Sequence, residues 1–180
     1  MNPSAPAIPR AVLIVGWTSA CTSILMIVMN IFSLISSSAM EEMLLSPNLL
    51  GMHVPPSLHA ALEVYQYGRY WLLYGILFFS FVLIAALQFL RLKAWGRRTL
   101  ETLCWIGLLN AFADSAFSYY SWIVTRNAMG DVMGHYGSGL SGMDQLGILA
   151  IALGFVLWVV PCLGLLVFLR RSSVRQAVSV

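Results

Sequence analysis

The chain has 180 residues, of which 59% are hydrophobic and only 9% are charged, against roughly 25% charged residues in an ordinary soluble domain. A water-soluble fold of this length cannot hide so much apolar surface, so the composition excludes a soluble enzyme and a separate catalytic domain. The net charge of +3 does not indicate nucleic-acid binding, because the cations lie in short segments beside long apolar runs.

Four long apolar segments follow one another with short polar breaks. They cover residues 11–36, 70–90, 99–125 and 146–169. At about 1.5 Å per residue, each exceeds the roughly 30 Å thickness of the hydrocarbon core of a bilayer. The first is also too long for the apolar region of a signal peptide. We therefore expect an all-α integral membrane protein, a single domain over residues 1–180 with four transmembrane helices in a bundle.

Lysine and arginine flank the four segments unevenly. Eight of them fall on one side: Arg10, Arg91, Lys93, Arg97, Arg98, Arg170, Arg171 and Arg175. Only Arg69 and Arg126 fall on the other side. The positive-inside rule then predicts that both termini are cytoplasmic. The basic loop with Trp95 after an aliphatic helix resembles that of many small bacterial inner-membrane proteins, so we expect a multi-pass protein of a bacterial inner (plasma) membrane. All seven tyrosines map to the opposite side and predict an aromatic belt there.

The turn between the second and third segments is short and basic. Its cations are Arg91, Lys93, Arg97 and Arg98. Such a cluster is expected to attract anionic lipid headgroups, with about 1 kcal/mol per cation. Bound lipid is the only ligand that the composition indicates.

The segment between the first two spans, residues 37–69, is predicted to form a short helical outer cap. Ser38 and Glu41 match a capping box, which favours a short helix over 39–45. A simple outward continuation of the first span is an equal alternative. Ser57 can cap a further helix that runs directly into the second span.

The segment between the last two spans, residues 126–145, contains five glycines. This density favours turns over a helix, and we expect a flexible loop. The segment lacks the lysine that a phosphate-binding loop requires.

The third span carries an acid, Asp114, well inside its apolar run. An acid within a bilayer costs about 3 kcal/mol or more, so it usually faces a partner, a cavity or a helix seam. Helical spacing and depth predict a polar intramembrane cluster of Asp114, Asn110, Asn30, Tyr74 and Ser118. The cluster could be a proton- or cation-linked site, or the polar end of a pocket. Alternatively, Asp114 could hold helices together through hydrogen bonds.

The fourth span has small residues and one proline on a single helical face. They are Gly147, Ala150, Gly154, Pro161 and Gly164. Small residues allow two helix backbones to approach closely, so this face is predicted to be a helix-packing seam. The sequence leaves open whether the seam is internal or belongs to a partner subunit.

The sequence contains few patterns that are typical of a catalytic site or a metal site. No GxSxG or HExxH motif occurs, and His53, His59 and His135 lack the spacing of a ligand pair. The three cysteines lie one each in the first, third and fourth spans, which argues against a disulfide framework. We expect no catalytic residues, no metal and no cofactor.

Three functions remain. The expected function is a non-catalytic accessory or structural subunit of a larger bacterial membrane complex, with membrane lipids and other membrane protein subunits as partners and no nucleic acid. One alternative is a small oligomeric transporter or channel with Asp114 in its pathway. A second is a lipid- or quinone-binding membrane protein that uses its aromatic rim.

Overall fold

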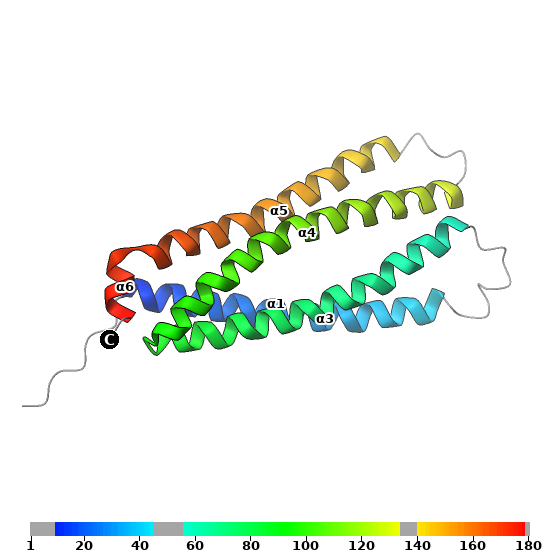
Figure 1. Ribbon diagram of the computed structural model, residues 1–180. Coiled ribbons are helices and arrows are strands. Elements are labelled where there is room, and N and C mark those ends of the chain that lie inside the picture. Colours follow the sequence, from blue (N-terminus) through cyan, green and yellow to red (C-terminus); the bar gives the residue numbers. More distant parts are fainter. Residues whose placement is uncertain (1–9, 45–55, 134–139, 179–180) are drawn as a thin grey trace, which may run out of the picture.

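The computed structural model describes residues 10–44, 56–133 and 140–178, and every regular element in these ranges is a helix. The four long helices are α1 (Arg10–Leu44), α3 (Pro56–Leu90), α4 (Ala94–Met133) and α5 (Leu140–Arg170), and a short helix, α6 (Ser172–Val178), follows. The long helices run side by side, up and down, and each packs against the next one along the chain (Figure 1). The prediction of an all-helical fold is confirmed.

Three of the helices are long and apolar enough to cross a membrane. The candidate spans are Arg10–Ser38, Ala60–Leu90 and Gln145–Arg170. The third predicted span, residues 99–125, lies within α4. This helix is not one of the three candidates because charged and polar side chains interrupt it, among them Glu101, Asn110 and Asp114.

The start of α1, the turn between α3 and α4, and α6 all lie at the same end of the molecule (Figure 1). We call this the basic end, because it carries eight of the ten lysines and arginines. The opposite end, toward which Arg69 and Arg126 lie on α3 and α4, is called the distal end.

The turn at the basic end is held by the closing hydrogen bonds of α3. Leu92 N–H donates to the Phe89 carbonyl (2.9 Å) and Lys93 N–H donates to the Gln88 carbonyl (3.1 Å). This pattern is a Schellman motif, with Leu92 in the left-handed position (φ 57°) that glycine usually takes. Leu92 also packs against the core, and this contact offsets part of the conformational cost.

The first helical turn of α4 lies in backbone contact with the end of α3. A side chain at Gly96 would collide with the backbone of Phe89 and Gln88. Only glycine permits this approach, so Gly96 fixes how tightly the α3–α4 hairpin closes.

The hydrophobic core lies at the basic end, where all five helices meet. It consists of Val12, Ala20, Ala85, Ala86, Phe89, Leu100, Leu169 and Val174. Phe89 and Leu169 are completely buried, and Val174 brings α6 into the same cluster. The short C-terminal helix therefore closes the base of the bundle.

Packing becomes looser along the helices. On α4, the stripe of residues Leu100, Cys104, Gly107 and Ala111 is buried. The same stripe continues with Asp114, Ser118, Ser121 and Thr125, and these four are only half-buried. On α1, buried Ala20 and Ser23 are likewise followed by half-buried Asn30 and Ser33. The helices thus enclose a dry base and a half-buried polar zone, and Val64 and Ala128 are buried again nearer the distal end.

The helices extend further than the sequence predicts. Helix α1 continues unbroken to Leu44, so the first span runs outward and no separate helix starts at residue 39. Helix α3 begins at Pro56 and leads directly into its apolar run. Helices α4 and α5 cover most of the predicted glycine-rich loop, and the burial of Ala128 stabilises the extension of α4. The rest of the cap and loop, residues 45–55 and 134–139, lies outside the described residues.

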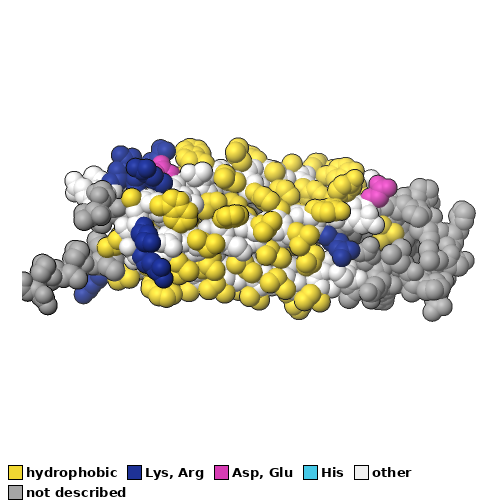
Figure 2. All heavy atoms as spheres, turned by 60° about the horizontal axis from the view of Figure 1, so that its bottom comes forward, with side chains coloured by type: hydrophobic (Ala, Val, Ile, Leu, Met, Phe, Trp, Pro, Cys, Tyr) yellow, Lys and Arg dark blue, Asp and Glu magenta, His cyan; other side chains and the backbone are white. Residues whose placement is uncertain are grey.

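Most of the outer surface along the bundle is apolar. Figure 2 shows hydrophobic side chains over the middle of the molecule and most of the visible basic ones gathered at one end. Of the three candidate spans, the one in α5 is the least covered: only 6% of its most apolar stretch is buried by the rest of the described chain. Lipid or another protein must cover such a surface in the native environment.

Candidate functional site: the polar zone between α3 and α4

Two hydrogen bonds between side chains link α3 to α4 in the polar zone. Trp71 Nε1 donates to Asp114 Oδ1 at 2.8 Å, and Asn110 Nδ2 donates to the Tyr74 hydroxyl at 2.7 Å. Trp71 and Tyr74 are three residues apart and Asn110 and Asp114 are four apart, so antiparallel helices align the two pairs as successive rungs. The structure therefore brings together three of the predicted cluster residues: Asp114, Asn110 and Tyr74.

The other two members of the predicted cluster have different surroundings. Asn30 donates to the carbonyl of Met26 on its own helix (2.8 Å), and its amide lies against Gly75 on α3. A side chain at position 75 would come within 3.1–3.3 Å of that amide, so Gly75 makes room for it. Ser118 lies one turn beyond Asp114 on the same half-buried stripe.

Sequence reasoning did not include Trp71 in the cluster, although it is the direct partner of Asp114 among the described residues. A signal was present, since Trp71 precedes Tyr74 by one helical turn just as Asp114 follows Asn110 by one turn. Indole N–H is a donor only, and the acid is the natural acceptor for it.

Aromatic rings surround the pair of Trp71 and Asp114. The Trp71 ring lies 5.5 Å from the Tyr74 ring and 6.3 Å from the Phe117 ring, between centroids. Toward the basic end the series continues through Phe78 and Phe79, whose ring lies 5.5 Å from that of Trp158 on α5. The acid thus lies beside a wall of aromatic rings that connects three helices.

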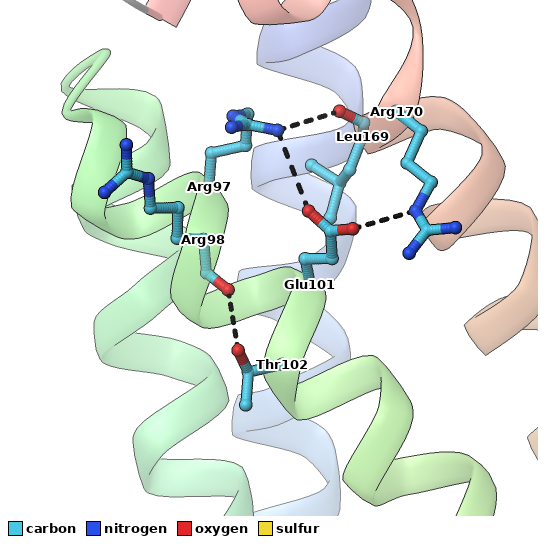
Figure 3. Close-up of polar contacts among 6 residues, drawn as sticks. All are labelled: Arg97, Arg98, Glu101, Thr102, Leu169 and Arg170. Carbon is cyan, nitrogen blue, oxygen red and sulfur yellow. Dashed lines mark hydrogen bonds and ion pairs between the residues drawn. The ribbon is translucent and has the colours of Figure 1, made fainter.

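The second set of polar contacts lies at the basic end (Figure 3). Glu101 accepts from Arg170 Nε at 2.8 Å and forms an ion pair with Arg97 at 3.7 Å. Arg97 also donates to the Leu169 carbonyl (3.4 Å), and the Arg170 guanidinium lies 5.7 Å from the centre of the Trp105 ring. This network joins α4 to the end of α5.

The predicted lipid-headgroup cations separate into two groups. Arg97 is engaged with Glu101 and Leu169 and is mostly buried, whereas Arg91, Lys93 and Arg98 are exposed. In Figure 3 the Arg98 side chain points away from the Glu101 network. Three of the four cations are therefore free of that network and accessible to anionic groups.

The predicted seam of α5 is in contact with the chain at one end only. A side chain at Gly147 would collide with the Trp122 ring of α4. In contrast, nothing lies within 4 Å of the position that a side chain would take at Gly154 or Gly164, and Ala150 and Pro161 are exposed. This chain therefore does not form the rest of the seam by itself.

Metal-ligating side chains do not gather in the part of the chain that the structure describes: it contains no group of three or more His, Cys, Asp or Glu that could hold an ion. His53 and His135 lie outside the described residues, and so does the side chain of His59. The three cysteines are free.

No family model, curated protein or solved structure matches this chain.

Proposed function

We propose that this protein is a non-catalytic accessory or structural subunit of a larger bacterial membrane complex. The observation that carries the proposal is the uncovered face of α5, where no described atom of another residue lies within 4 Å of the position that a side chain would take at Gly154 or Gly164. Some other helical glycines allow close approach, as Gly16 does against Leu90 and Gly147 against Trp122, whereas Gly68 and Gly130 are open like those of α5. An unused face of the same kind suits a helix of a partner subunit.

In this proposal α4 also crosses the membrane, which makes four transmembrane spans, and both termini are cytoplasmic in a bacterial inner membrane. The asymmetry of the cations supports this orientation, because eight belong to the basic end and only Arg69 and Arg126 belong to the other. Glu101 supports the assignment of α4 to the bilayer, since its pairing with two arginines reduces the cost of an acid near the membrane boundary.

The experiment is purification of the tagged protein in mild detergent under native conditions, with wild type and Gly154→Leu compared. A subunit is expected to elute with fixed partners in constant ratio, and Gly154→Leu is expected to release them because a large side chain blocks the close approach. Ser172→Leu, an exposed residue at the basic end, serves as the matched control. Wild-type protein that elutes without any partner in constant ratio would contradict the proposal.

The second candidate is a small oligomeric transporter or channel with Asp114 in its pathway. The half-buried polar zone favours it, because Asp114 and Ser118 lie on the same stripe of α4. Solute flux into proteoliposomes that Asp114→Asn abolishes would place this candidate first, and flux that is unaffected by the substitution would remove Asp114 from the pathway.

A further inference from the structure

We propose that Asp114, together with the rings of Trp71, Tyr74 and Phe117, forms a binding site for a small organic ammonium ion. The site goes beyond the role of a subunit, because all of its residues come from this chain and no partner is needed to complete it.

The first step concerns the carboxylate of Asp114, in which one of the two oxygens accepts a hydrogen bond. Asp114 Oδ1 accepts the hydrogen bond from Trp71. Among the described residues, Gln88 Oε1 is the only buried side-chain oxygen or nitrogen without a hydrogen bond. Within the described part of the chain no hydrogen bond reaches Asp114 Oδ2, and this oxygen is not one of the buried atoms without a partner, so it is accessible at the surface. An acid at membrane depth with one open oxygen is a site for a cation.

The second step is the chemistry of the neighbours, which selects the kind of cation. The faces of Trp71, Tyr74 and Phe117 attract positive charge and prefer a weakly hydrated alkylammonium group. A metal ion instead needs several oxygen ligands. The Asn110 amide nitrogen donates to the Tyr74 hydroxyl, Phe117 offers carbon only, and Asp114 supplies the only negative charge among these groups. One carboxylate oxygen among aromatic rings therefore suits an organic ammonium ion better than sodium or magnesium.

The third step is access. Toward the basic end the α4 stripe is closed, because Ala111, Gly107 and Cys104 are buried. Toward the distal end Ser118 and Ser121 are half-buried, and the Tyr74 side chain is 38% exposed. Arg69, two residues from Trp71, donates to Ser38 Oγ of α1 at 3.4 Å. The ion would enter from the distal side.

The test uses the full chain in nanodiscs of phosphatidylglycerol, which has no amine in its headgroup. Choline and its neutral carbon isostere, dimethylbutanol, are titrated in ligand-observed NMR. We expect choline to bind at least about tenfold more tightly than the isostere, because only choline gains the ionic and ring contacts.

Asp114→Asn is the decisive variant, since the amide oxygen can still accept from Trp71 while the charge is removed. It should abolish the preference for choline and leave the thermal transition of the protein unchanged. Glu63→Gln, an exposed acid further along α3, is the matched control and should keep the preference. Equal binding of choline and dimethylbutanol to wild type, or an unchanged preference in Asp114→Asn, would overturn the site.

An ammonium group could also come from a lipid headgroup. The titration is therefore repeated in nanodiscs that contain phosphatidylethanolamine, where a site reached from water should keep its affinity for choline. A loss of about tenfold or more would overturn the assignment to a small molecule. Neither result depends on co-purifying subunits, so failure of the ammonium site and failure of the subunit proposal are distinguishable.

Discussion

The basic end and the polar zone contain one acid each, and the two acids differ in their partners and in the burial of their surroundings. Glu101 has two arginine partners, and the surrounding apolar side chains are buried. Asp114 has a single neutral donor, Trp71, and the neighbouring stripe is half-buried. An acid paired with two arginines at the rim of a packed core stabilises the fold, whereas an acid with an open oxygen retains the capacity to bind a further group.

The largest loss of stability is expected for a substitution in the tightly packed core at the basic end. Phe89→Ala should lower the free energy of unfolding by about 3–5 kcal/mol, because it leaves a cavity among completely buried side chains. Phe81 lies two turns away on the same helix and is 60% exposed, so Phe81→Ala should cost less than about 1 kcal/mol. Reversible unfolding in mixed micelles measures both. Similar costs for the two variants would show that the base is not specially packed.

The next effect concerns the hairpin turn. Gly96→Ala should destabilise the protein by about 1–3 kcal/mol, since its new methyl group meets the backbone of α3, which cannot move aside. Gly154→Ala meets no atom and should be neutral or slightly stabilising in the isolated protein, because alanine favours the helix. Thermal unfolding of the two variants side by side measures the difference. Equal destabilisation of the two variants would contradict it.

A smaller effect is expected for the charge network. Glu101→Gln should cost about 1 kcal/mol, because it leaves Arg97 and Arg170 without their shared carboxylate while solvent still screens a partly exposed cluster. The cost should shrink as salt rises. Chemical unfolding at low and high ionic strength measures it, and a cost that does not depend on salt would mean that packing rather than charge is responsible.

The smallest effect is the coupling energy between Trp71 and Asp114, which share a hydrogen bond. A double-mutant cycle with Trp71→Phe and Asp114→Ala should give about 0.6 kcal/mol, the usual value for a hydrogen bond between membrane helices. A coupling several times larger would make Asp114 a structural residue like Glu101 and would remove the contrast between the two regions.

Composition was sufficient to predict the all-helical architecture and the positions of the apolar runs, because the bilayer imposes length and polarity on each segment. Helix ends were less predictable. Helix α1 passes beyond Ser38 and α4 passes Gly130, since neither a capping pattern nor a glycine ends a helix on its own. A short turn between α3 and α4 was predicted, but the backbone contact at Gly96 that closes this hairpin was not, because such a contact has no periodic signal.

Part of the polar site was predictable from helical periodicity and from the depth of each residue in its span. Helical spacing placed Asn110 and Asp114 on one face, and depth placed Tyr74 opposite them. Depth alone cannot fix the rotation of one helix about its axis, so the choice between Trp71, Tyr74 and Asn30 as the partner of Asp114 needed the structure. Glu101 was overlooked because both of its partners look like ordinary topology cations in the sequence.

The most direct test of a closed base and an open polar zone is thiol accessibility along α4. In a background without native cysteines, Ser118→Cys and Ala111→Cys are treated with a membrane-impermeant trimethylammonium methanethiosulfonate, added on the side of Arg69 and Arg126. The half-buried position 118 should react much faster than the buried position 111. Equal rates at the two positions, or faster reaction at 111, would contradict the account.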